Sequence, residues 1–369
     1  MAKDYQPKYL FIEESVRDEI LTQNVLKNLP SLTPRYYHVQ SELNLSRLSI
    51  KDGKEVLIVA RQKGRFLKEC PGSKDSLCCG YFILESASNC NYDCTYCVLQ
   101  SYLNSPPLIV YANIGDMFKE LNGIFEVHSK IQFRIGTGEL SDSLSLDHIT
   151  EFSKLIVPFF AEKKRALIEL KTKSTQIKNL EALDHKGHTI ASWSLNTKRM
   201  ARREELKAPS IEERVEAARQ CQSWGYPVSF HLEPLLYYPE WEEDYHELIH
   251  YLFQHINPSS ITWISLGGLR LLNNLKEVTE ERFPKSSFLY EELIPGTDGK
   301  LRYLKLLRLE LYRKISGWIR QYGGQVPMYL CMESSEVWRK GLGFDFEDAD
   351  KADQFLGQKV FSDTPEDRG

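Results

Sequence analysis

The sequence lacks any apolar run that approaches the roughly 18 residues needed to cross a membrane. Its first residues, Met-Ala-Lys-Asp-Tyr-Gln, contain no apolar signal core. It also has no Gly/Ser-rich linker and no internal repeat. These absences predict a cytoplasmic protein without a membrane partner, and they favour one domain with extensions over a string of modules.

Cysteine is sparse, with eight in 369 residues, which is too few for a disulfide scaffold. The net charge of −4 argues against a generic nucleic-acid-binding protein. This negative charge is concentrated in residues 344–369, where eight acidic residues accompany three basic ones. The rest of the chain is therefore close to neutral, and local basic patches on it could hold a polyanion.

Three of the cysteines stand close together, in the spacing C-x3-C-x2-C formed by Cys90, Cys94 and Cys97. An iron–sulfur cube needs four ligands, usually cysteine thiolates. A loop that offers three leaves one iron open, which is how enzymes of the S-adenosylmethionine (SAM) radical superfamily bind SAM. An aromatic residue before the third cysteine is typical of that superfamily, and Tyr96 stands there.

A structural zinc site is the competing interpretation of the same loop. Zinc prefers four closed ligands, often supplied as two separated pairs. No second C-x2-C pair occurs, since Cys78 and Cys79 are adjacent and the remaining cysteines are widely separated. The spacing therefore favours the open-iron cluster, with zinc or a redox-active thiol cluster as alternatives.

Apolar stretches predict six strands after residue 80, and helical patterns separate them. The strands are expected at 81–84, 131–135, 167–170, 190–195, 228–232 and 261–266. The clearest helix begins with a capping box of Ser210 and Glu213, and weaker patterns cover 147–160, 176–183 and 242–253. This alternation predicts parallel strands joined by right-handed crossovers, and hence an α/β fold with a partial (β/α)6 barrel of the TIM type.

The predicted organisation has four parts. Residues 1–80 form an N-terminal extension, 81–270 the barrel, 271–343 a C-terminal region, and 344–369 an acidic tail. In such barrels the chemistry gathers at the C-terminal ends of the strands. The cysteine loop follows the first predicted strand, which is the position that this architecture requires.

The next three strand ends carry candidate cofactor ligands. After the second strand, Gly138 allows close approach of a ligand, Glu139 offers a carboxylate for the SAM ammonium, and Ser141 follows. Lys173, after the third strand, could pair with the SAM carboxylate or a phosphate. Ser194, at the end of the fourth, offers a compact hydrogen-bonding group. Each could instead be an ordinary loop or surface residue.

Two further segments are candidates for substrate contact. His231 and Glu233 lie two apart on the fifth strand, so they share a face and could serve in acid–base chemistry or form a buried pair with no chemistry. Asp298-Gly299 predicts a tight turn that presents Lys300, Arg302 and Tyr303. Basic and aromatic side chains together suit a wedge or clamp on nucleic acid, although an ordinary surface turn could have the same residues.

From about residue 70 to residue 303 the chain resembles the spore photoproduct lyase family, radical-SAM enzymes that repair DNA. The matching segments are Cys90–Gln100, Ser141-Asp142, Leu146–Thr150, Thr172-Lys173, Ser194–Asn196, Glu213–Ala218, Gly225–Pro227, Trp241–Tyr245 and Arg302-Tyr303. The later matches are individually weak, but their order and spacing together are specific.

The resemblance implies a [4Fe–4S] cluster and SAM as cofactors, and DNA with a methylene-bridged thymine dimer as substrate. A radical derived from SAM takes a hydrogen from this lesion and two thymines result. Tyr96 would then lie beside the cofactor, Ser141, Lys173 and Ser194 would contact SAM, and Arg302 with Tyr303 would enter the DNA. The reaction also requires a reducing electron donor such as flavodoxin or ferredoxin.

The chain departs from the family where the substrate radical is quenched. The family draws a hydrogen atom from a cysteine beside the Ser-Asp pair, relayed by a tyrosine, whereas Glu139 and Val98 occupy these positions here. A carboxylate is a poor hydrogen-atom donor, so another group quenches the radical or the substrate differs. A radical-SAM enzyme with another substrate therefore stays an alternative, with Glu139, His231 and Glu233 shaping its pocket. A nucleic-acid-binding protein with a structural or redox-sensing cluster is the third.

Overall fold

The computed structural model describes residues 4–43, 45, 48–73, 76–77, 79–344 and 346. The chain divides into two compact units. The first comprises Met1–Glu69, Phe82–Asn91 and Tyr102–Thr189, and the second comprises Cys70–Tyr81, Tyr92–Ser101 and Ile190–Gly369. Cys78 and the acidic tail of residues 344–369, apart from Phe344 and Phe346, lie outside the described residues. Within those residues, no helix is both long and apolar enough to span a bilayer.

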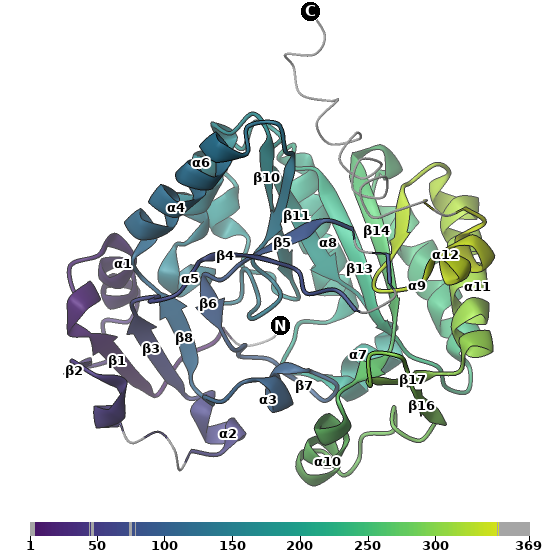
Figure 1. Cartoon of the computed structure of the whole chain (residues 1–369), viewed down its shortest axis with the longest axis horizontal. Helices are drawn as coiled ribbons and strands as arrows, with labels where there is room; N and C mark the ends of the chain where they lie inside the picture. Colours follow the sequence, from purple (N-terminus) through teal and green to yellow (C-terminus); the bar gives the residue numbers. More distant parts are fainter. Residues whose placement is uncertain are drawn as a thin grey trace, which may run out of the picture. The chain divides into compact units, whose positions relative to one another are not determined.

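A five-stranded sheet in the first unit has the order β2-β1-β3-β8-β6 (Figure 1). Its strands are β1 (Tyr9–Glu13), β2 (Arg35–Tyr37), β3 (Val56–Ala60), β6 (Ala87–Ser88) and β8 (Leu108–Tyr111). Helix α1 (Ile20–Asn28) lies between β1 and β2 in the chain, and α4 (Ile114–Val127) follows β8. β1 is parallel to β2 and β3, β3 is parallel to β8, and β6 is antiparallel to β8. The predicted N-terminal extension thus supplies three of these strands, and the predicted barrel range supplies two.

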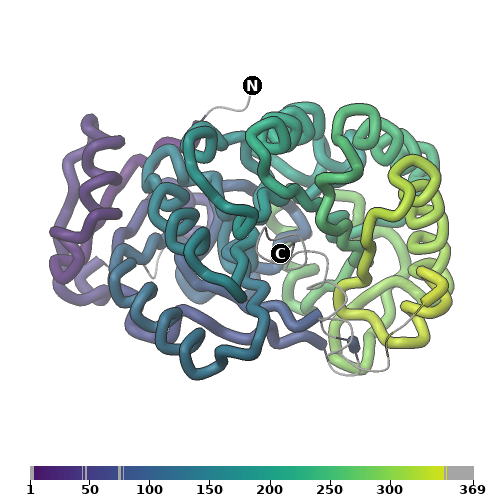
Figure 2. Tube along the Cα trace, turned by 90° about the horizontal axis from the view of Figure 1, so that it is seen from above, coloured from purple at the N-terminus to yellow at the C-terminus, as the bar shows by residue number. Residues whose placement is uncertain are grey.

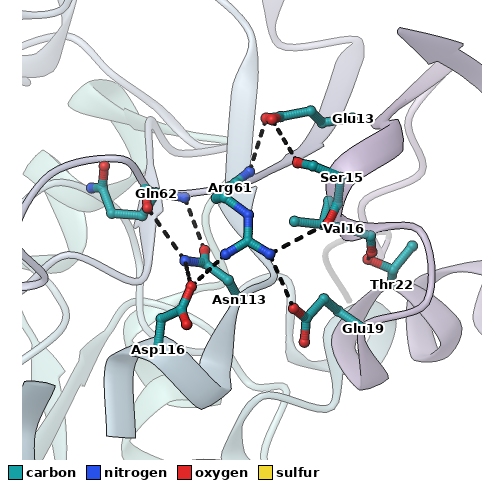
Figure 3. A network of polar contacts seen from close by, with 9 residues as sticks. All are labelled: Glu13, Ser15, Val16, Glu19, Thr22, Arg61, Gln62, Asn113 and Asp116. Carbon is teal, nitrogen blue, oxygen red and sulfur yellow. Dashed lines mark hydrogen bonds and ion pairs between the residues drawn. The ribbon is translucent and has the colours of Figure 1, made fainter. Parts of the chain in front are cut away.

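A polar network fastens the carboxyl ends of β1 and β3 (Figure 3). The Arg61 backbone N–H donates to Glu13 Oε2 at 3.0 Å, while the Arg61 guanidinium pairs with Asp116 on α4. Asn113 accepts the Gln62 N–H on its side-chain oxygen at 2.9 Å. These bonds satisfy backbone groups that the strand ends would otherwise leave without partners.

All six strands predicted for the barrel are present. They are β5 (Tyr81–Leu84), β9 (Phe133–Gly136), β10 (Ala166–Thr172), β11 (Thr189–Ser194), β13 (Val228–Leu235) and β14 (Ile261–Gly268). In the first unit β9 is parallel to β10, and β5 is antiparallel to β4 (Leu67–Glu69). In the second unit β11, β13, β14 and β18 (Met328–Leu330) are successive parallel neighbours. β18 escaped prediction because three apolar residues are too few to show a period.

The helices confirm two predictions. α8 (Ile211–Ser223) begins with the expected capping box, in which Ser210 Oγ accepts the Glu213 N–H at 3.2 Å and Glu213 Oε2 accepts the Ser210 N–H at 2.8 Å. α9 (Trp241–His255) covers the third weak pattern. Figure 2 shows α12 (Ser335–Leu342), in yellow, alongside α11 (Lys305–Gly323), which also packs on α9.

Two other helix predictions were confirmed only in part. The pattern at 147–160 is divided into α5 (Asp147–Thr150) and α6 (Ser153–Ala161), because Glu151 adopts a left-handed φ of 51°. The Asp147 carboxylate stabilises this break by accepting the Ser153 N–H at 2.8 Å and its hydroxyl at 2.6 Å. The pattern at 176–183 yields only the 3-10 turn Lys178–Leu180.

Substitutions at Ser210 test whether the capping box stabilises the N-terminus of α8. Ser210→Ala removes the acceptor of the Glu213 N–H and should lower the free energy of unfolding by about 1 kcal/mol. Ser210→Asp keeps an acceptor and should lie close to the wild type. Urea unfolding followed by tryptophan fluorescence measures both, and equal losses in the two variants would contradict a capping role.

Candidate active site

The loop after β9 places Gly138 and Glu139 against β10. A Cβ added at Gly138 would lie 2.7 Å from Lys171 Cβ and 2.8 Å from Lys171 O, so the close approach of the two strands itself requires glycine. Glu139 forms an ion pair with Lys171, and its side chain is 34% exposed. The predicted ligand carboxylate is therefore present at a strand end, already paired with a cation and still accessible.

Ser141 is buried and fixes the residue that precedes Cys90. Its hydroxyl donates to Asn89 O at 2.8 Å, and the Asn89 N–H donates to Leu140 O at 2.8 Å. Asn89 adopts a left-handed φ of 69°, and its side-chain oxygen accepts the Cys90 N–H at 2.8 Å. Asparagine tolerates this conformation because its side chain bonds the local backbone. The predicted SAM-binding segment thus holds the start of the cysteine loop.

Asp142 organises the ends of both strands, a role that the sequence did not reveal. Its carboxylate accepts the Lys173 N–H at 2.7 Å and the Ser145 N–H at 2.8 Å, and it also accepts the Thr172 hydroxyl at 2.5 Å. The half-buried Lys173 is thereby fixed at its backbone beside the loop of Glu139.

In the second unit, Cys94 and Cys97 belong to one tight turn. The Cys97 N–H donates to Cys94 O at 3.2 Å, and the Gln100 side chain donates to the carbonyls of Cys94 and Thr95 at 2.9 and 3.1 Å. Cys94 is buried and Cys97 is half-buried. Soft thiolates on a turn are the donor set that iron–sulfur clusters use, so these residues fit such a cluster. No three His, Cys, Asp or Glu side chains among the described residues form a site for a single metal ion.

Tyr96 lies between these cysteines and is buried. Its hydroxyl donates to Glu205, and its ring meets Phe288 edge-on at 6.1 Å between centroids. Burial, followed by the Glu205 carboxylate, raises the pKa of Tyr96 well above its usual value. The phenol therefore stays protonated and keeps donating this hydrogen bond.

Glu205 belongs to β12 (Glu205–Leu206), which pairs antiparallel with β7 (Asp93–Cys94) and sets Glu205 opposite Cys94. The preceding Glu204 accepts the Thr95 hydroxyl at 2.6 Å and the Ser286 hydroxyl at 2.6 Å. Sequence reasoning missed both glutamates, because nothing in the sequence distinguishes a buried glutamate from the solvated ones around it.

Ser194, His231 and Glu233 lie together at the ends of β11 and β13. Ser194 is opposite His231 in the strand register, and His231 Nδ1 is 3.6 Å from Glu233 Oε1. Glu233 also accepts the hydroxyl of Ser265 on β14. The predicted shared face of His231 and Glu233 therefore exists, and Glu233 is its more exposed member, at 22%.

The hairpin predicted around Asp298-Gly299 is present as β16 (Leu293–Pro295) and β17 (Leu301–Tyr303), which are antiparallel, and Gly299 has a φ of +76°. Arg302 folds back to pair with Asp298 and is only 11% exposed. Burial raises the pKa of Asp298, but hydrogen bonds from Ser73, the Lys300 N–H and Arg302 outweigh it and lower the net value.

The expectation that the hairpin presents Tyr303 is wrong for this structure. Tyr303 is fully buried, its hydroxyl accepts the Tyr237 N–H at 3.1 Å, and its carbonyl accepts from Arg308 at 2.6 Å. The ring meets the Tyr237 ring at 6.2 Å between centroids, and burial of an aromatic ring in such an edge-on contact is favourable.

Parallel strands whose carboxyl ends carry these polar groups, together with a three-cysteine loop, define the class of radical-SAM partial barrels. Within that class the chain belongs to the spore photoproduct lyase family, whose family model matches residues 41–302. The lyase of Geobacillus sp. (strain Y412MC61) is 24% identical over 303 residues, which cover 79% of this chain and 86% of that protein. The lyase of Bacillus subtilis (strain 168) is 23% identical, with 79% and 81% covered.

Solved structures confirm the predicted fold. A substituted spore photoproduct lyase with bound AdoMet and dinucleoside spore photoproduct matches with a TM-score of 0.80 and 21% identity. A spore photoproduct lyase complexed with dinucleoside spore photoproduct also gives 0.80 and 21%. Each match covers 89% of this chain and 100% of the other.

Gly138 provides a test of the β9–β10 strand ends. Gly138→Ala forces a Cβ into Lys171 and should lower the free energy of unfolding by about 1–3 kcal/mol. Gly123→Ala is the matched control: it lies within α4 with nothing inside 4 Å of an added Cβ, so it should stabilise the protein slightly. Thermal unfolding of the two variants checks this, and a Gly138→Ala protein as stable as the wild type would contradict the close approach.

Proposed function

We propose that this chain binds a [4Fe–4S] cluster through Cys90, Cys94 and Cys97, cleaves SAM reductively, and repairs spore photoproduct in DNA. Membership of the spore photoproduct lyase family over residues 41–302 is the observation that carries this proposal. The turn at Cys94 and Cys97, held by buried polar groups, supports the cluster. An external electron donor such as flavodoxin or ferredoxin would supply the electron.

The cofactors, when bound, would supply a carbon radical that can take a hydrogen atom from the substrate. The chain's own residues would bind and orient them. Glu139 gives one carboxylate oxygen to Lys171, which leaves the other for the SAM ammonium. Gly138 keeps the backbone close to this position. Lys173 would meet the SAM carboxylate, and Ser194 would offer a hydrogen bond.

Tyr96 would stand beside the cofactor as a fixed wall, because its hydroxyl is committed to Glu205. Ser141 would act mainly by holding Asn89, since its hydroxyl already donates there. His231 and Glu233 would contact the substrate, with Glu233 the better placed for proton exchange because it is partly exposed.

A second candidate is a radical-SAM enzyme of the same fold with a different substrate. Its support is the ion pair of Glu139 with Lys171, because a carboxylate in that state has no hydrogen atom to give. Product analysis separates the two candidates: SAM cleavage with no thymine formed from the photoproduct would favour this second function.

Cys94→Ala tests the cofactor. The reconstituted wild type, given reductant, SAM and dinucleoside spore photoproduct, should form thymidylyl-thymidine. Cys94→Ala should lose the cluster's visible absorbance and SAM cleavage, because a cube with two protein ligands is not retained. Cys221→Ala, whose thiol is buried on α8 with a raised pKa, should keep both. A Cys94→Ala protein that still cleaves SAM would sink the cluster assignment.

Lys300 and Arg302 on the hairpin are proposed to contact the DNA backbone. Arg302 would exchange Asp298 for a phosphate on binding. Lys300→Ala and Arg302→Ala should each weaken duplex binding and reduce the slope of log K against log salt by about 1. Arg219→Ala removes an exposed charge from α8 and serves as the control. Filter binding over a salt series measures this, and slopes identical to that of the control would contradict the contact.

A further inference from the structure

Glu205 and Arg214 form an ion pair in the interior of the second unit. Arg214 Nη1 lies 2.5 Å from Glu205 Oε2, and the two side chains are 0% and 1% exposed. Removing two charges from water is costly, and packed apolar residues at such positions often serve stability as well or better. A buried pair therefore raises the question of what the charges do.

The pair is attached to the segment that carries two of the proposed cluster ligands. Glu205 lies opposite Cys94 in the β7–β12 register, and its other carboxylate oxygen accepts the hydroxyl of Tyr96. Arg214 is on α8, where its Nε donates to Pro209 O at 2.9 Å and its Nη1 to Ser194 O at 3.1 Å. Both charges are thus held in fixed positions.

The contacts place the negative charge of the pair nearer to the cysteine turn than the positive charge. The chain of bonds runs from the cysteine turn through Tyr96 to the carboxylate, and only then to the guanidinium. Adding an electron to a cluster is opposed by a nearby negative charge and favoured by a positive one. Both effects are larger in a buried environment than in water. Cluster potentials respond to such local charges, hydrogen bonds and exposure.

We propose that the Glu205–Arg214 pair sets the reduction potential of the cluster, with Glu205 lowering it and Arg214 raising it. Through its bond to Tyr96, Glu205 is also a positioning residue for the cysteine turn. This inference rests on the proposed cluster at Cys90, Cys94 and Cys97.

Other charges near the cysteine turn are more exposed to solvent than Glu205 and Arg214, and one of them serves as the control for the buried pair. Asp93 pairs with Arg282 at 2.9 Å and with Lys207 at 3.2 Å, and the Lys207 side chain is 55% exposed. Solvent and salt screen such an exposed charge. Lys207→Gln should therefore shift the potential much less than a change in the buried pair.

The test is a redox titration of the reconstituted cluster, followed by the electron paramagnetic resonance of its reduced form, without SAM or DNA. Glu205→Gln keeps an acceptor for Tyr96 but removes the negative charge, so its potential should be more positive. Arg214→Gln should make the potential more negative. Arg214→Lys, which keeps the charge, should lie near the wild type. The double variant Glu205→Gln/Arg214→Met should lie between the wild type and Glu205→Gln, because the lost negative charge is the nearer of the two.

Opposite shifts from the two single variants are a signature that a merely structural pair would not produce. Shifts of the same sign, or shifts no larger than that of Lys207→Gln, would overturn the inference and leave the repair proposal intact. If Arg214→Gln does not fold, Glu205→Gln and the double variant decide alone. If the wild type assembles no cluster, the cofactor proposal and this inference are overturned together.

Discussion

Two consecutive buried carboxylates, Glu204 and Glu205, hold the cysteine turn of the second unit. Glu204 takes the hydroxyls of Thr95 and Ser286, and Glu205 takes that of Tyr96. A loop that carries metal ligands needs such support, because ligand geometry is only as precise as the groups behind it. Burial of a carboxylate requires such partners, and Glu205 has the buried Arg214 in addition, so the turn and the end of α7 (Lys198–Glu204) are mutually dependent.

The strand ends of the first unit follow the same logic. Glu139 is paired with Lys171, Asp142 binds the backbone of Lys173, and Ser141 binds the carbonyl of Asn89. These charged and polar residues are of the types that bind a charged cofactor, and in this structure they also fix the loops in which they lie. This makes the candidate site preorganised, since its polar groups are oriented by neighbours within the same unit.

Local patterns predicted well where the interactions are local. The six barrel strands, the capping box of Ser210 and Glu213, and the turn at Gly299 all depend on residues a few positions apart. Two predictions failed for different reasons. Glu151 breaks a helix that the apolar period continues, and the break is stabilised locally by Asp147 and Ser153, which apolar periodicity does not register. Tyr303, expected on a surface turn, is buried because its contact with the distant Tyr237 outweighs the local preference.

The sequence alone determined the cysteine spacing, the alternation of strands and helices, and the family to which both belong, because these are properties of residue type and order along the chain. Only the tertiary structure decided that Glu205 and Arg214 are buried together beside Tyr96, and that Gly138 is required by Lys171. Burial and pairing are set by segments far apart in sequence, and they decide whether a charged side chain is solvated or acts on its neighbours in a medium of low polarity.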